Sequence, residues 1–452
     1  MTALALLRAW WWPAFVFVYP LLAWPVTGPT RAGAAELHWW IAGVALVGGL
    51  ALELSAPRPA PPGNLIAWAR ARPAVLLALI FGAWCLLAAA FAPDQRAAYL
   101  GGFYDRADGA LWVGAMVLVF VLVARGHSRD PGLAGRLTWA LALAVALVSL
   151  GALVEVARGA GIFYKYIAAD MPLVSFPQKG HLAGLLVMGA AAAAGLAGRG
   201  RWLAVLPALA LGLTVNRAGW LALAVVLVFL LWRERARWPL ALALVVALVV
   251  AVGAGWLLVG QQQGESAKQA TSEGSLTSRT YFWRSAARGI LARPLTGWGG
   301  GQYYLHWGDY LSFPELKENL RLELGETLIR YTKGEKTPFH TRKADGSTLN
   351  RYYTAWKAHN ELLEQSLMHG LVGLALYLTL LILTLAQARR APLGAFAAFL
   401  GYQVFLLLWF VIPESDGLLW SLWALSAGEA AVRRVPTPPD PLVEPVVSQP
   451  SA

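Results

Sequence analysis

Three segments of the sequence carry residue types that could hold an anionic group and move a proton. The first is Asn216-Arg217-Ala218-Gly219, which stands between two apolar runs. An arginine at membrane depth is costly and usually functional unless it reaches the surface, and its planar fork donates two hydrogen bonds to a phosphate. We interpret Arg217 as a fixed cation for an anionic group entering from the lipid. The alternative is an ordinary interfacial anchor.

The second segment, residues 278–293, interleaves Arg279, Arg284, Arg288 and Arg293 with aromatic and aliphatic residues. Pro294 then favours the end of a helix. A basic helix with aromatic residues is typical of one lying on anionic headgroups. In the alternative, the aromatics stay at the interface while one or two arginines face a lipid-linked phosphate. The glycine-rich turn that follows would allow a close approach of the backbone.

The third segment, residues 358–365, lies where a polar interval returns to an apolar run, and it contains His359. Asn360 is the expected N-cap of a helix, and Glu361 suits its first turn. A helix N-terminus disfavours an imidazolium, so His359 should tend to stay neutral and able to accept a proton, although Glu361 acts in the opposite direction. We interpret His359 as a general base, with a structural histidine as the alternative.

Further ionisable residues could support these segments or compete with them. Lys179 and His181 begin another apolar run on the same expected side, where they would add to a phosphate site or anchor to headgroups. His306 and His340 are competing bases. The sequence contains no HExxH, paired-aspartate or Cys/His pattern, so we expect neither a metal site nor a cofactor. A single cysteine, Cys85, excludes an intrachain disulfide.

The composition predicts that a membrane positions these segments. Hydrophobic residues make up 58% of the chain and charged residues 14%, against roughly 45–50% and about 25% in soluble domains. Because one globular core cannot bury that excess, we expect an all-α polytopic membrane protein. The net charge of +12 would suit nucleic acid, but most arginines lie between apolar runs, so membrane topology explains them and no nucleic-acid partner is expected.

Twelve apolar runs are candidate transmembrane helices, and the polar interval forms one large loop between the ninth and the tenth. The runs are 9–24, 38–54, 74–92, 109–124, 137–157, 181–198, 202–215, 218–232, 238–259, 361–386, 393–412 and 417–432. With a cytoplasmic N-terminus, the short inside segments carry sixteen Lys and Arg against seven outside. The loop then faces the periplasm. The expected parts are spans 1–9 (1–260), the periplasmic loop (261–358), spans 10–12 (359–434) and a disordered cytoplasmic tail (435–452).

The interval 202–232 is predicted to be a hairpin rather than one helix. As a single helix it would span about 46 Å, well beyond a hydrocarbon core of about 30 Å. Basic residues also flank both of its ends, which places both ends on one side. We therefore expect a turn at Asn216-Arg217, with Arg217 below the outer surface. Within the loop, the amphipathic pattern of 316–324 predicts a helix that covers the site.

Together these motifs resemble the O-antigen ligase superfamily, which includes O-antigen ligases, some O-antigen polymerases and protein O-oligosaccharyltransferases. The resemblance covers roughly residues 200–380. It is carried by Asn216-Arg217-Ala218-Gly219-Trp220, by Ser278-Arg279…Trp283…Pro294-Leu295-Thr296-Gly297-Trp298-Gly299, and by His359-Asn360…Leu362…Gly370-Leu371-Val372-Gly373. The interval 302–357 departs from the family in length and resembles an insertion for acceptor recognition.

The resemblance implies metal-independent transfer of a glycan from undecaprenyl diphosphate to an acceptor hydroxyl, with inversion at the anomeric carbon. It implies that Arg217 and an arginine of 278–284 bind the diphosphate, that Arg279 fits the Ser-Arg pair better than Arg284, and that His359 acts as the base. The expected acceptor is lipid A-core. A second lipid-linked glycan (polymerase) and a protein hydroxyl are the alternatives. A transporter of a lipid-linked glycan is the rival from another class, but the sequence shows neither inverted repeats nor interrupted helices.

Overall fold

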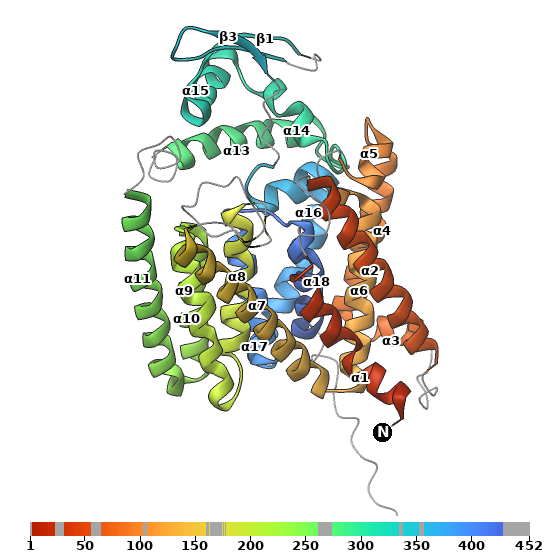
Figure 1. Ribbon diagram of the computed structural model, residues 1–452. Helices are drawn as coiled ribbons and strands as arrows, with labels where there is room; N and C mark the ends of the chain where they lie inside the picture. The colour runs from red at the N-terminus through yellow and green to blue at the C-terminus, as the bar shows by residue number, and fades with distance from the viewer. Residues whose placement is uncertain are drawn as a thin grey trace, which may run out of the picture.

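The protein is a bundle of apolar helices with a small mixed domain at one end (Figure 1). The structure is a computed structural model that describes residues 2–22, 31–55, 65–102, 106–159, 162, 174, 176, 178–260, 274–333, 338–351 and 357–427. The bundle helices are α1 (Ala3–Val18), α2 (Arg31–Leu54), α4 (Pro73–Ala90), α6 (Ala110–Arg129), α7 (Gly132–Arg158), α8 (Lys179–Ala194), α9 (Val205–Leu213), α10 (Arg217–Arg233), α11 (Trp238–Gly260), α16 (Glu361–Leu385), α17 (Leu393–Leu406) and α18 (Pro413–Ala427). Each predicted apolar run overlaps one of them.

The length and composition of these helices confirm the prediction of a mostly helical membrane protein. Within the described residues, six helices are long and apolar enough to cross a bilayer, and three shorter apolar ones are Ala3–Val18, Lys179–Ala194 and Leu393–Leu406. The count of twelve crossings stays a prediction, as does the side on which the loop lies. The predicted disordered tail, 435–452, falls outside the described residues. Cys85 is buried in α4 as a free thiol.

Helix α8 forms the centre of the bundle and carries Lys179 and His181 at its first turn. Nearly all of its side chains are buried, and most of them are small or aliphatic. Small residues let neighbouring helices approach closely. Gly184 lies against aromatic rings of α17, and Gly189 lies against Val145 of α7. The position of the first turn of α8 is therefore fixed by packing on several sides.

The predicted hairpin over 202–232 is present, although its first arm is irregular. The arm begins with the 3₁₀ segment η2 (Gly198–Ala204), continues as α9 and turns at residues 214–216. Val215 has a positive φ of 49°. The Asn216 side chain then caps α10 by accepting a hydrogen bond of 3.0 Å from the Gly219 amide. Gly219 lies against Leu211 of α9, so the chain reverses here.

The polar interval folds into a domain with its own core. Its described elements are α13 (Gly274–Ala292), α14 (Tyr303–His306), η4 (Trp307–Tyr310), α15 (Phe313–Leu324), β1 (Thr327–Tyr331), β2 (Phe339–Arg342) and β3 (Thr348–Arg351). Figure 1 shows α13 lying across the end of the bundle, with α15 and the strands on its far side. The predicted helix over 316–324 is confirmed within α15, where Ser312 and Glu315 form a capping box. Residues 261–273, 334–337 and 352–356 fall outside the described residues.

The all-α prediction was wrong for one part of this domain. The described residues include an antiparallel sheet of order β1-β2-β3, with an irregularity between Leu328 and Arg330. Leu328, Phe339 and Thr341 turn toward the core that contains Trp307, while polar residues face outward. Strands of four or five residues give too few alternations for a period of two to be recognised.

Helix α16 is interrupted at Gly370, which the sequence did not lead us to expect. Gly370 has φ 69° and ψ −177°. The turn 294–299 fits against this interruption. The amides of Trp298 and Gly299 donate to the carbonyls of Leu367 (2.7 Å) and Met368 (3.1 Å). The amide of Leu371 donates to the Pro294 carbonyl at 2.7 Å. The close backbone approach expected of this turn is therefore made with α16.

The remaining short elements connect these parts. They are α3 (Leu65–Arg70), α5 (Gln95–Leu100), η1 (Arg106–Asp108) and η3 (Arg235–Arg237). Two glycines of the loop domain, Gly300 and Gly301, pack closely against η1 and the residues just before it. A Cβ on Gly300 would collide with the Asp108 carbonyl, and a Cβ on Gly301 would collide with Gly102. The loop domain is thus seated directly on the end of the bundle.

Candidate active site

An aromatic pair between α17 and α18 collects several of the predicted site residues. Residues 407–412 are irregular, and within them the rings of Trp409 and Phe410 stack at 5.5 Å with an interplanar angle of 9°. We call this pair the aromatic platform. The His359 ring meets both members edge-on at 5.1 Å, and the His181 ring meets them at 6.1 and 5.7 Å. The Arg279 guanidinium lies 5.4 Å from the Trp409 ring centre. Histidine and arginine from three separate elements therefore converge here.

Polar contacts hold the irregular segment 407–412 in place. The Asn360 side-chain amide donates to the Leu407 carbonyl at 2.8 Å, and Arg279 donates to the Leu408 carbonyl at 3.3 Å. The buried carboxylate of Glu361 accepts from the Val411 amide at 2.9 Å. Because a buried loop must satisfy its backbone groups, these side chains allow a non-helical segment to be buried here. The sequence placed 407–412 inside a span, and that boundary was wrong.

His359 occupies a strained backbone position that its neighbours support. Its φ is 55°, a conformation uncommon for any residue with a side chain. The ring stacks on Phe282 of α13 at 5.8 Å and 19°. Asn360 caps α16 as predicted, because its side chain accepts from the Leu363 amide at 3.1 Å. The imidazole is thus enclosed between α13 and the platform and remains partly exposed.

The hydrogen bond made by His359 defines which ring nitrogen can act as a base. Nδ1 lies 3.0 Å from the Lys357 carbonyl oxygen. A carbonyl oxygen only accepts, so Nδ1 must carry the proton in the neutral ring. Nε2 is then the unprotonated nitrogen. This arrangement suits proton abstraction.

Arg279 is the arginine of α13 that faces the platform. Its burial lowers the pKa of the guanidinium, and Glu323 acts in the opposite direction. The group still remains charged, because arginine does not lose its proton in proteins. Held by one carbonyl and one ring, it keeps further N–H donors for an anion.

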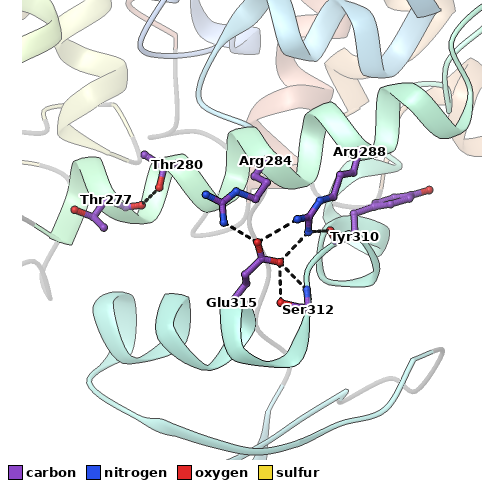
Figure 2. Close-up of polar contacts among 7 residues, drawn as sticks. All are labelled: Thr277, Thr280, Arg284, Arg288, Tyr310, Ser312 and Glu315. Atoms are coloured by element: carbon purple, nitrogen blue, oxygen red, sulfur yellow. Dashed lines mark hydrogen bonds and ion pairs between the residues drawn. The ribbon is translucent and has the colours of Figure 1, made fainter.

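Arg284 faces the other side of α13 (Figure 2). It pairs with Glu315 of α15 at 2.7 Å, and Arg288 pairs with the same carboxylate at 2.8 Å. Hydrogen bonds from Arg288, with weaker contributions from Ser312 and Arg284, hold the pKa of Glu315 well below its usual range. The structure therefore does not bring Arg284 to the platform. Its contacts join α13 to α15.

The two residues predicted from α8 occupy different positions. His181 is buried against the platform, and Gly180 beside it leaves no room for a Cβ because Trp409 lies directly on the backbone. Lys179 is partly buried at the first residue of α8. Through His181, the first turn of α8 therefore lies against the same platform as His359.

Arg217 is the first residue of α10 and is exposed. Among the described residues, no hydrogen bond, ion pair or ring contact joins it to the platform. Gly219, two residues on, lies near Ala183 of α8, so Arg217 shares the His181 end of the bundle. The prediction that it sits below the outer surface stays a prediction.

Several buried charged residues beneath His359 were not recognised as site residues. Lys357 pairs with Asp108 of η1, and Glu364 accepts from the Ala358 amide. Carboxylates in the first turns of an apolar run were the available signal for Glu361 and Glu364. Nothing local in the sequence signals that Asp108 and Lys357 form a pair.

Two competing histidines have other contacts, and no candidate metal site is found in the described part of the chain. His306 pairs with Asp309 at 3.2 Å, and His340 hydrogen-bonds Asn350 at 2.6 Å. Across those residues, no group of three or more His, Cys, Asp or Glu is arranged to hold a metal ion.

Residues 202–378 match the family model described as O-antigen ligase. This range begins just before α9 and ends within α16, so it includes Arg217, Arg279 and His359. Neither a curated protein nor a solved structure matches the chain.

Proposed function

The chain belongs to the O-antigen ligase superfamily, and from this we propose that it transfers a glycan from undecaprenyl diphosphate to a hydroxyl of lipid A-core. The family supports glycosyl transfer of the ligase or polymerase type on lipid-linked glycans. We further propose that the protein is a multi-pass protein of the bacterial inner membrane and that its site faces the periplasm. Membrane lipids surround it, and the reaction uses no metal or cofactor.

One observation carries the proposal: Arg279 and His359 reach the same aromatic platform from different elements. A transferase that uses a diphosphate leaving group needs a fixed cation near that group and a neutral base near the acceptor. Arg279 supplies the first in a partly buried position, where electrostatic stabilisation is stronger than in water. His359 supplies the second through Nε2.

In the proposed reaction, the oxygen of the acceptor hydroxyl attacks the anomeric carbon of the donor glycan, and His359 Nε2 takes the proton of that hydroxyl. The bond from that carbon to the diphosphate oxygen breaks, and undecaprenyl diphosphate leaves with the electron pair. Arg279 stabilises the developing charge, with Arg217 and Lys179 as further cations at the same end of the bundle and His181 and Asn360 in support. Attack from the opposite face inverts the anomeric centre. The resulting imidazolium then releases its proton to solvent.

The test is reconstitution with purified protein. Undecaprenyl-diphosphate glycan and lipid A-core should give product, and His359→Ala should abolish it while the protein keeps its melting temperature. General-base catalysis contributes about 10²–10⁴-fold, so a His359→Ala protein with wild-type turnover would refute the assignment. If only a second lipid-linked glycan serves as acceptor, the protein is a polymerase.

A deletion strain distinguishes the same two activities in the cell. Loss of a ligase should leave lipid A-core without an O-chain while lipid-linked polymer accumulates. Loss of a polymerase should leave single-repeat caps on lipid A-core. Modification of a protein hydroxyl as the main product would instead indicate a protein oligosaccharyltransferase.

A further inference from the structure

A buried ion pair lies directly behind the His359 turn. Asp108, the last residue of η1, pairs with Lys357, and both side chains are buried. The two residues are 249 positions apart in the chain. We propose that this pair is a positioning device for His359, which deepens the proposed function and rests on it.

The contacts lead from the ion pair to the imidazole in one step. Lys357 lies two residues before His359, and its carbonyl is the acceptor for His359 Nδ1 at 3.0 Å. Its ammonium also lies 5.9 Å from the centre of the Phe410 ring. Fixing the Lys357 side chain therefore fixes the group that sets the tautomer of the base.

The turn needs such support because its backbone is strained. A residue with a side chain at positive φ persists only when the surrounding structure determines it. Two carboxylates hold the turn from below: Asp108 holds Lys357, and Glu364 accepts from the Ala358 amide. Asn360, the residue after His359, is held by the hydrogen bond that its side-chain amide donates to the Leu407 carbonyl. Each residue from 357 to 360 is therefore fixed by its own contact or by that of its immediate neighbour.

Asp108 is itself held by the loop domain. A Cβ on Gly300 would collide with the Asp108 carbonyl, so the glycine-rich turn after α13 lies flat on this residue. The turn also bonds α16 through Trp298 and Gly299. The ion pair thus joins the loop domain to the base, and the seating of the domain is transmitted to His359.

Net stabilisation is a weak explanation for the pair. The free energy lost when two charges leave water is about as large as the free energy gained from their attraction. Replacing both residues by apolar ones therefore often leaves the stability of the protein unchanged. Removing one partner leaves an uncompensated buried charge. A variant that neutralises both partners therefore separates positioning from folding.

The deciding variant is Asp108→Asn with Lys357→Met, measured in the full-length protein. We expect a melting temperature near that of the wild type and an unchanged KM for donor and acceptor. We expect kcat to fall by between about tenfold and 10²-fold, the scale for a misplaced catalytic group. Exchanging the charges, with Asp108→Lys and Lys357→Asp, should regain part of the lost kcat, which also keeps the test valid if the neutral pair folds poorly.

A second readout does not depend on activity. Diethyl pyrocarbonate labelling of His359, followed by mass spectrometry, reports the accessibility and protonation of the ring. The neutral pair should change the labelling rate of His359 and leave that of His340, on the sheet, unchanged. The matched control is Arg237→Met with Glu234→Gln, which removes a partly buried pair of 2.7 Å near Ala194, at the far end of α8; it should alter neither kcat nor His359 labelling.

The outcomes separate the two proposals. Wild-type kcat and wild-type His359 labelling in the neutral pair would overturn the positioning role, whatever His359→Ala does. If His359→Ala remains active but the neutral pair still changes labelling of His359, the positioning stands and the assignment of the base falls.

Discussion

Arg279 and Arg284 give the sharpest test, because both lie on α13 but contact different partners. Arg279 contacts the platform, whereas Arg284 is 51% exposed and pairs with Glu315 (Figure 2). We expect Arg279→Ala to remove most of the activity and Arg284→Ala to have a small effect. The comparison therefore tests separately two residues that the sequence offered together.

The magnitude follows from the bonds each guanidinium can make. A hydrogen bond to a charged group contributes about 1.5–3 kcal/mol, so two bonds from Arg279 to a diphosphate amount to about 3–6 kcal/mol. At about 1.4 kcal/mol per factor of ten, kcat/KM should fall by about 10²–10⁴-fold. An exposed pair contributes about 0.2–1 kcal/mol, and Arg288 still holds Glu315 when Arg284 is lost.

The assay is glycan transfer by the purified variants at saturating and limiting donor. Arg279→Lys is the graded control: it keeps a charge without the planar fork, so its activity should lie between those of the wild type and Arg279→Ala. Melting temperatures show whether each variant is folded. The reasoning is refuted if folded Arg284→Ala loses as much kcat/KM as Arg279→Ala.

Four further outcomes are expected. Gly297→Ala should lower the melting temperature more than Gly346→Ala: both positions have positive φ, costing roughly 1–2 kcal/mol, but only at Gly297 would a Cβ collide with α16. Glu315→Gln should destabilise the protein at neutral pH. Because the folded pKa of Glu315 is depressed, its contribution is present above about pH 4.3 and is lost as pH falls through the folded pKa, so melting curves of the two proteins should converge in acid. Asn360→Asp should keep the cap of α16 but lower turnover, because it loses the donor to Leu407. Transfer by the wild type should be unaffected by EDTA, and loss of product on chelation would contradict the metal-independent mechanism.

Much of the helical architecture could be predicted, because apolar composition and run length act locally. Every predicted run overlaps a helix, the chain turns at Asn216 as expected, and Asn360 caps α16 as expected. Hydropathy does not register where a helix stops inside an apolar stretch. For that reason the run 393–412 concealed the end of α17 at Leu406 and the irregular segment that carries Trp409.

Members of the candidate site could be picked out from the sequence where an ionisable residue stands beside an apolar run. Arg279, His181 and His359 are polar residues beside apolar runs, and the structure places all three at one platform. The missed members depend on contacts between distant parts of the chain. Asp108 and Lys357 each look ordinary in their own segment, and only the fold makes them a pair.

The interruption of α16 bears on the rival reading of the chain as a transporter. In transporters, the unwound part of a broken helix offers its free carbonyls and amides to the substrate or ion. Here the groups freed at Gly370 are occupied by the protein itself. The carbonyls of Leu367 and Met368 accept from the turn 294–299, and the Leu371 amide donates to Pro294; Trp84 occupies the His369 carbonyl at 2.9 Å. The interruption of α16 at Gly370 is therefore the place where the loop domain attaches to the bundle. That use explains why Gly297 and Gly370 occur in one chain: each allows the close backbone approach that the other requires. A rigid attachment of this kind suits an enzyme, whose base must keep a fixed distance from a leaving group bound on another element.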